Sequence, residues 1–134
     1  MGACRRATAL MQLLAIGVGA TLGAWLRWGL SVWLNAAFVS LPMGTLIANL
    51  GGAFLIGIAV GVFQDLPALS PQWRLLVVTG FLGALTTFST FSAESMLLIQ
   101  RGELGWAMAH SSVHLIGSVA LCIAGLAAWR FIAG

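Results

Sequence analysis

The chain has 134 residues, of which 60% are hydrophobic and only 7% are charged. Because soluble domains carry about 25% charged residues, this composition excludes an ordinary soluble fold and indicates an all-α membrane protein. A spanning helix needs roughly 20 apolar residues, so the length accommodates about four spans in one domain, residues 1–134. The six basic residues are all arginines and form no cluster beside aromatic side chains, which argues against nucleic acid as a partner.

The first predicted span covers about residues 8–37 and contains Arg27. It is too long for one untilted crossing, so either the helix extends beyond the lipid or Arg27 faces water in a vestibule. Gly19 and Gly23 form a GxxxG pair, which is typical of a helix face that packs closely against another helix.

The second predicted span covers about residues 43–63. Small or polar side chains recur along it at a spacing of four, namely Thr45, Asn49, Ala53, Gly57 and Gly61. This face is expected to meet protein rather than lipid, and so many close-packing faces in a short chain favour a dimer. Asn49 needs a partner inside the bundle, as either an interhelical hydrogen-bond clamp or a donor to a transported anion.

The third predicted span covers about residues 73–99, and five of the seven residues from Thr86 to Ser92 carry hydroxyls. Gly80 and Gly83 weaken the helix ahead of this run, and hydroxyls can bond backbone groups that a break releases. At a break near the membrane midplane, a half-helix N-terminus attracts anions and freed carbonyls can coordinate a cation. The alternative is a packing face rich in serine and threonine.

Phe88 and Phe91 lie among these hydroxyls, three residues apart. Aromatic rings in membrane helices are commonly packing or lipid contacts. Their positive ring edges, however, favour an anion without binding it tightly, which conduction requires. Glu94 follows on the same span, and its carboxylate would hinder an anion unless it is protonated, bonded to hydroxyls or placed at the pore mouth.

The fourth predicted span covers about residues 104–131 and begins with a polar patch, namely His110, Ser111, Ser112, His114 and Ser118. Two histidines at this spacing can bind zinc, but no third ligand is evident in the sequence. A polar lining or interhelical hydrogen bonding is therefore favoured over a metal site. The chain has no recognisable nucleophile–base pair, phosphate-binding loop or carboxylate pair, so no enzyme is expected.

The arginines give only a weak signal for orientation. Four spans put both termini on one side, with four arginines there and two on the other: Arg5, Arg6, Arg74 and Arg130 against Arg27 and Arg101. So slight a bias orients a protein weakly under the positive-inside rule, which makes insertion in both orientations, and an antiparallel pair, plausible.

Three runs resemble a known family. The run Gly83–Ser92 resembles the G-x-x-T-T-F-S-T-F signature of the Fluc fluoride channels, the CrcB family. The run Gly44–Gly57 resembles that family's G-T-x-x-x-N-x-x-G segment, and the run Gly19–Arg27 resembles its first-helix motif. Length and number of spans agree as well, so the resemblance covers essentially the whole chain.

The resemblance implies an antiparallel, dual-topology homodimer in the bacterial inner membrane, with two pores that export fluoride passively. It implies that Asn49, Phe88 and Phe91 line each pore. It also implies a structural sodium ion at the dimer centre, held by the backbone carbonyls of Gly83 and Thr86 from both subunits.

Further residues are assigned to the same pathway. Arg27 matches the family's vestibule arginine, where it would raise the local anion concentration. The remaining pore residues that we predict are Thr45, Ser89, Thr90, Glu94 and Ser118.

Two other classes of protein compete with this interpretation. A small dual-topology multidrug exporter needs a membrane-embedded carboxylate in its first span to exchange protons for cations, and residues 8–37 contain no acid. A non-transporting membrane assembly factor would not need a polar break beside paired rings.

Overall fold

A computed structural model describes the backbone of residues 2–37 and 40–134, without the side chains of residues 2–4 and 37. All regular secondary structure in these ranges is helical. Its elements are α1 (Gly2–Leu34), η1 (Asn35–Ala37), α2 (Met43–Asp65), α3 (Pro71–Arg74), η2 (Leu75–Leu82), α4 (Gly83–Leu85), α5 (Phe88–Gln100) and α6 (Leu104–Ala133). Four helical segments are long and apolar enough to cross a membrane, which confirms the prediction of an all-α protein with four spans.

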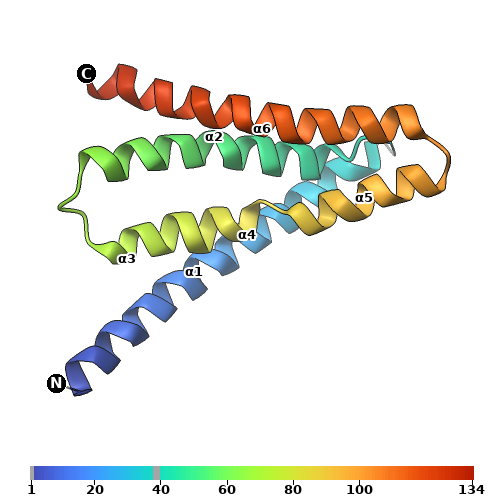
Figure 1. Ribbon diagram of the computed structural model, residues 1–134. Helices are drawn as coiled ribbons and strands as arrows, with labels where there is room; N and C mark the ends of the chain where they lie inside the picture. Colours follow the sequence, from blue (N-terminus) through green and yellow to red (C-terminus); the bar gives the residue numbers. More distant parts are fainter. Residues whose placement is uncertain (1, 38–39) are drawn as a thin grey trace.

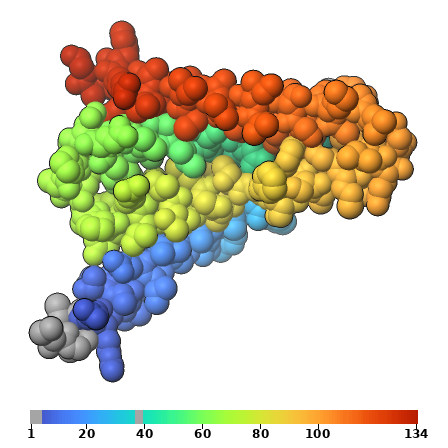
Figure 2. All heavy atoms as spheres, in the orientation of Figure 1, coloured from blue at the N-terminus to red at the C-terminus, as the bar shows by residue number. Residues whose placement is uncertain are grey.

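The helices run back and forth between two ends of the molecule. Helices α2 and α6 lie side by side along their length, and α5 packs beside the first half of α6 (Figure 1). Helix α1 crosses the others obliquely, and its N-terminal part diverges from them (Figures 1 and 2). Both termini lie at the same end, as an even number of spans requires.

Glycines allow the helix backbones to approach closely at two crossings. A Cβ atom on Gly57 would collide with the Cys122 carbonyl of α6, and one on Gly125 would collide with the Phe54 carbonyl of α2. The faces predicted from the glycine spacing therefore do meet protein. The partners lie in the same chain, however, so this packing does not bear on the predicted dimer.

The second crossing joins α1 to η2. A Cβ atom on Gly19 would collide with the Leu76 carbonyl, and one on Gly80 would lie 2.7 Å from the Ile16 carbonyl. Gly80 is thus required for close packing against α1. The role that we predicted for it from the sequence was different, namely to weaken the helix.

The third spanning segment changes its backbone geometry along its length. A short α3 continues into η2, a π-helix of 8 residues, and then into α4. Thr86 (φ −79°, ψ 151°) and Thr87 (φ −147°, ψ 115°) then adopt extended conformations before α5 begins at Phe88. The change of direction therefore falls at the two threonines, three residues beyond Gly83.

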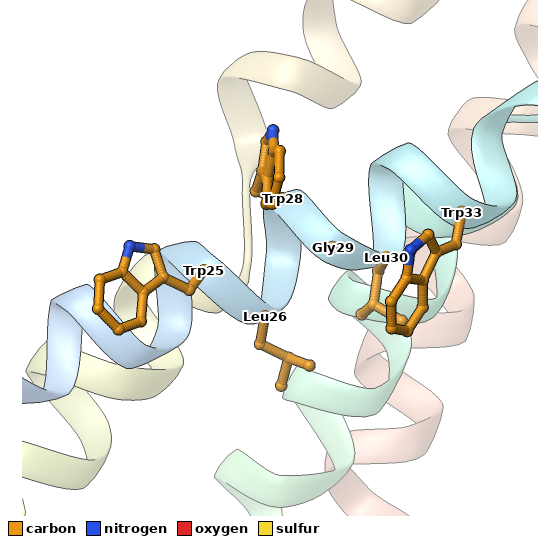
Figure 3. Close-up of a pocket in the computed structure, with 6 residues that line it drawn as sticks. All are labelled: Trp25, Leu26, Trp28, Gly29, Leu30 and Trp33. Carbon is orange, nitrogen blue, oxygen red and sulfur yellow. The ribbon is translucent and has the colours of Figure 1, made fainter.

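The outer surface of the helices is apolar, as contact with lipid requires. Large side chains such as Leu13, Trp33 and Phe131 are mostly exposed. A hollow of about 470 Å³ on α1 is lined by Trp25, Leu26, Trp28, Gly29, Leu30 and Trp33 (Figure 3). Indole rings are common where a helix meets the membrane surface, so we interpret this hollow as part of the lipid-facing surface.

Candidate functional site

Asn49 of α2 holds the extended segment between α4 and α5. Its Oδ1 accepts a hydrogen bond from the Thr87 backbone N–H at 2.7 Å, which fixes the orientation of the amide. Its Nδ2 donates to the Thr87 carbonyl at 3.1 Å and contacts His114 Nδ1 at 3.1 Å. Of the two roles considered for Asn49, this geometry is that of the interhelical clamp, because both amide hydrogens are already engaged.

Side chains replace the helical hydrogen bonds at the break. In a continuous α-helix the Thr87 N–H would donate to the Gly83 carbonyl, and the Thr90 N–H to the Thr86 carbonyl. Here the Thr87 N–H donates to Asn49, and the Thr90 N–H donates to Thr87 Oγ1 at 3.1 Å. The break therefore releases the carbonyls of Gly83 and Thr86 from their helical donors.

Arg27 of α1 lies against the same break. Its Nε donates to the Ala84 carbonyl at 3.1 Å, and the residue is half-buried. The structure therefore brings Arg27 to a carbonyl that the end of α4 leaves without a helical donor. This contact was not predicted from the sequence.

Glu94 of α5 is bonded through both of its oxygens. Thr45 Oγ1 donates to Oε1 at 2.6 Å, and His110 Nε2 lies 3.3 Å from Oε2. Thr45 and His110 are fully buried. Of the three environments considered for this carboxylate, bonding to a hydroxyl is the one observed, and a histidine joins it.

Two residues that the sequence analysis did not select support this arrangement. Asn35 Oδ1 accepts from the backbone N–H groups of Gly44 at 2.7 Å and Thr45 at 3.3 Å, which fixes the start of α2. Ser95 Oγ lies 3.0 Å from His110 Nδ1 and orients that ring. Neither Asn35 nor Ser95 could be recognised from spacing along the chain, because their hydrogen bonds join separate helices.

The two phenylalanines lie in different environments. Phe91 stacks on His110, with ring centroids 5.3 Å apart, and also packs against His114 at 5.0 Å. Phe88 lies 5.5 Å from Phe91, but its side chain is 80% exposed. A single chain therefore places Phe91 against the cluster of Glu94, His110 and His114, and it places Phe88 on the outer surface.

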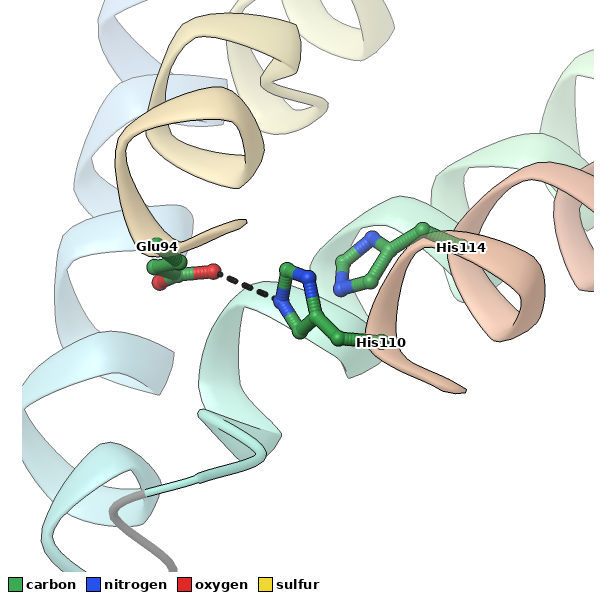
Figure 4. A group of neighbouring side chains, drawn as sticks. All are labelled: Glu94, His110 and His114. Carbon is green, nitrogen blue, oxygen red and sulfur yellow. Dashed lines mark hydrogen bonds and ion pairs between the residues drawn. The ribbon is translucent and has the colours of Figure 1, made fainter. Parts of the chain in front are cut away.

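His114 has a buried nitrogen, Nε2, without a hydrogen-bond partner among the described residues. Because the Asn49 amide donates to Nδ1, a neutral His114 carries its proton on Nε2. The ring extends from α6 towards His110, and their centroids are 4.5 Å apart (Figure 4). Asn49 thus makes His114 a hydrogen-bond donor that faces the cluster.

Ser89 and Thr90, two of the three remaining predicted hydroxyl residues, lie at the break. Thr87 Oγ1 donates to Thr90 Oγ1 at 3.0 Å, and Ser89 Oγ lies 3.3 Å from Thr87 Oγ1. Ser118 lies one turn beyond His114 on α6 and makes no hydrogen bond with the described part of the chain. The structure therefore brings Ser89 and Thr90 to the break and leaves Ser118 apart from both networks.

Glu94 also supplies the third metal-binding group that the sequence did not reveal. One donor atom each from Glu94, His110 and His114 can be chosen so that all lie within 4.8 Å of one another (Figure 4). The two histidines come from α6 and the carboxylate from α5, so local spacing could not identify this set.

Comparison with known proteins identifies the family. Residues 14–126 match the family model described as CrcB-like protein, Camphor Resistance (CrcB). A relative from Pseudomonas putida is 56% identical over 125 residues, which cover 93% of this chain and 98% of the relative. A relative from Chromohalobacter salexigens is 59% identical over 117 residues, covering 87% and 89%. Both relatives are named fluoride-specific ion channel FluC, and the chain belongs to the CrcB family.

Proposed function

We propose that the protein is a fluoride-selective channel that lets fluoride leave the cytoplasm passively. The observation that carries this proposal is the 56% identity, over nearly the whole chain, to a relative named as a fluoride-specific channel. Conduction by a channel needs no chemical step, so no enzymatic activity is proposed.

In the proposed pathway, His114 supplies a hydrogen-bond donor to fluoride. A buried donor without a partner costs about 1–3 kcal/mol, so an acceptor that reaches Nε2–H relieves that cost. Fluoride is small and strongly hydrated, and a hard N–H donor can replace part of its hydration shell. Phe91 packs against both imidazole rings and narrows the same region.

Asn49 serves this pathway indirectly. Because its amide hydrogens go to Thr87 and His114, it positions the break and sets the tautomer of the histidine. Thr45 and His110 hold the Glu94 carboxylate and so limit its repulsion of an anion. Ser89, Thr90 and Ser118 are proposed as further hydroxyl positions along the path.

A structural sodium ion fits the carbonyls at the break. Gly83 and Thr86 each have a carbonyl whose helical donor is engaged by a side chain, and oxygen atoms are suitable ligands for a hard cation. One chain offers two such carbonyls, and a second chain would double that number. The ion would join the two subunits and add positive charge between the two pores.

The proposed assembly is an antiparallel dual-topology homodimer in the bacterial inner membrane, with the break near the membrane midplane and two pores. The exposed Phe88 ring supports a partner surface beside the cluster, because a second subunit could cover it and bring it to a pore. Arg27 would then stand where the break meets a vestibule and attract anions. The multidrug-exporter alternative remains disfavoured, since α1 contains no acidic residue.

The test is fluoride efflux from liposomes that contain the purified protein, followed with a fluoride electrode. We expect rapid release of fluoride and almost no release of chloride. Efflux equal to that of empty vesicles, across a range of sodium concentrations, would contradict the proposal.

A further inference from the structure

We propose that Glu94, His110 and His114 form a binding site for Zn²⁺ and similar transition-metal cations, and that an ion bound there blocks fluoride movement. Only the block rests on the proposed function. Binding of the metal depends on the side chains alone and can be measured without any transport.

The arrangement of the ligands suits a tetrahedral ion. Nitrogen and oxygen ligands lie about 2.0–2.2 Å from zinc, so two ligands of one tetrahedral ion are roughly 3.3–3.5 Å apart. His110 Nε2 and Glu94 Oε2 are already 3.3 Å apart. The donor atom of His114 lies within 4.8 Å of the other two, so a small rotation of its ring completes a three-ligand site. Water or fluoride can occupy the fourth position.

Neighbouring side chains orient two of the ligands. When a metal replaces the proton on His110 Nε2, Ser95 Oγ, 3.0 Å from Nδ1, can accept a hydrogen bond from Nδ1–H and hold the Nε2 lone pair towards the ion beside Glu94. Thr45 holds the other oxygen of the Glu94 carboxylate at 2.6 Å. Such outer partners raise metal affinity because they fix the tautomer and orientation of the ligands.

His114 couples metal binding to the break. Ligation through Nε2 moves the proton of a neutral ring to Nδ1, where it faces the Asn49 amide, which is also a donor. The hydrogen bond between Asn49 and His114 is therefore lost when the metal binds. The ion thus removes the Nε2–H donor proposed for fluoride. It also breaks the Asn49–His114 hydrogen bond, which is one of the three contacts made by the Asn49 amide.

A cavity beside the end of α5 reaches Glu94, one of the three ligands. It has a volume of about 80 Å³ and is lined by Pro42, Glu94, Leu97, Leu98 and Arg101. Arg101 lies at the C-terminal end of α5 and is exposed. Glu94 is therefore within reach of an ion that arrives from that end.

The test is a titration of detergent-purified protein with Co²⁺, followed by displacement with Zn²⁺. The background is Cys4→Ser/Cys122→Ala, because thiolates are themselves zinc ligands. We expect the strong visible absorption of tetrahedral cobalt, its loss on addition of Zn²⁺, and no displacement by Mg²⁺, which prefers octahedral oxygen sites. The absence of this absorption in the background protein would overturn the proposal.

Variants separate the site from adventitious binding. Glu94→Gln and His110→Gln are expected to abolish the absorption, whereas Ser112→Ala, an exposed position on α6, is the matched control and should leave it unchanged. Ser95→Ala keeps all three ligands and is expected to lower the affinity about tenfold or more. If the ligand variants do not fold, Ser95→Ala decides, and an unchanged affinity would contradict the site.

Asn49→Asp tests the coupling. A carboxylate at this position can accept from both the Thr87 N–H and a His114 Nδ1–H, so Nε2 is left free as a ligand. We expect this variant to bind cobalt about tenfold more tightly. Weaker binding than the background protein would show that the tautomer argument is wrong.

The block is measured separately, as fluoride efflux from liposomes with and without Zn²⁺. We expect Zn²⁺ to stop efflux in the cysteine-free background, and we expect the Zn²⁺ concentration that halves efflux to rise about tenfold or more in Ser95→Ala. Equal efflux with and without Zn²⁺, in protein that binds cobalt, would overturn the block. Vesicles that release no fluoride in either condition would contradict the channel and leave the cobalt result standing.

Discussion

The break at Thr86–Thr87 and the cluster of Glu94, His110 and His114 are neighbours joined by Asn49, but they are built differently. At the break, side chains satisfy backbone groups, and the Asn49 amide makes three contacts with Thr87 and His114. In the cluster, side chains from α2, α5 and α6 bond one another. The break therefore combines a local hydroxyl motif with one side chain from α2, whereas the cluster depends entirely on how the helices pack.

The largest effect is expected from Asn49→Ala, which removes the side chain that contacts both the break and the cluster. The Thr87 N–H loses its acceptor, and an unsatisfied buried donor costs about 1–3 kcal/mol. We expect fluoride efflux to fall to the level of empty vesicles and thermal unfolding to occur at lower temperature. Asn49→Asp keeps the acceptor for the Thr87 N–H and is the control for the unfolding temperature only, because its carboxylate also changes the tautomer of His114. Normal efflux in Asn49→Ala would show that the clamp is dispensable.

Removal of sodium tests the break without changing the cluster. If the Gly83 and Thr86 carbonyls hold the ion, exhaustive replacement of sodium by a large organic cation should weaken the dimer or stop conduction. Size-exclusion chromatography and fluoride efflux measure the two outcomes. A dimer and an efflux rate that are both indifferent to sodium would refute the assignment of these carbonyls.

Phe91→Ile tests the aromatic contacts of the cluster. The variant removes ring contacts with both histidines, and each aromatic contact is worth about 0.5–1.5 kcal/mol. We expect lower fluoride efflux with the subunit assembly intact. Phe88→Ile is the companion variant, and it should lower efflux only if a second subunit brings the exposed ring to a pore. Unchanged efflux in both variants would remove the rings from the mechanism.

The smallest effect is expected at the start of α5. Thr87→Val removes the hydroxyl that accepts from the Thr90 N–H, and loss of such a cap costs about 0.5–2 kcal/mol. Thr87→Ser keeps the hydroxyl and should unfold at the wild-type temperature. Equal unfolding temperatures for the valine and serine variants would contradict a capping role for this side chain.

Much of the break could be predicted from the sequence. The hydroxyl run after Gly80 and Gly83 indicated an interruption of the third span, and the position of Asn49 within a span indicated that it needed a partner. The reason given for the interruption was incomplete. Gly80 packs against α1. The backbone becomes extended where the side chains of Asn49 and Thr87 accept hydrogen bonds from the N–H groups of Thr87 and Thr90.

The cluster could be predicted only in part. The histidine spacing placed His110 and His114 on one face, but the carboxylate that completes the set lies 16 residues before His110 on another helix. Likewise, the spacing of Phe88 and Phe91 could not tell which ring faces the histidines. These contacts depend on the packing of α5 on α6, which no local pattern encodes.

The most direct test of the account compares fluoride efflux from liposomes containing wild-type protein with efflux from liposomes containing His114→Leu. The variant introduces an apolar side chain of similar size and removes the Nε2–H donor that Asn49 directs at the cluster. The account predicts rapid, chloride-excluding efflux in the wild type and strongly reduced efflux in the variant. Equal efflux from the two proteins would contradict the proposed path of fluoride.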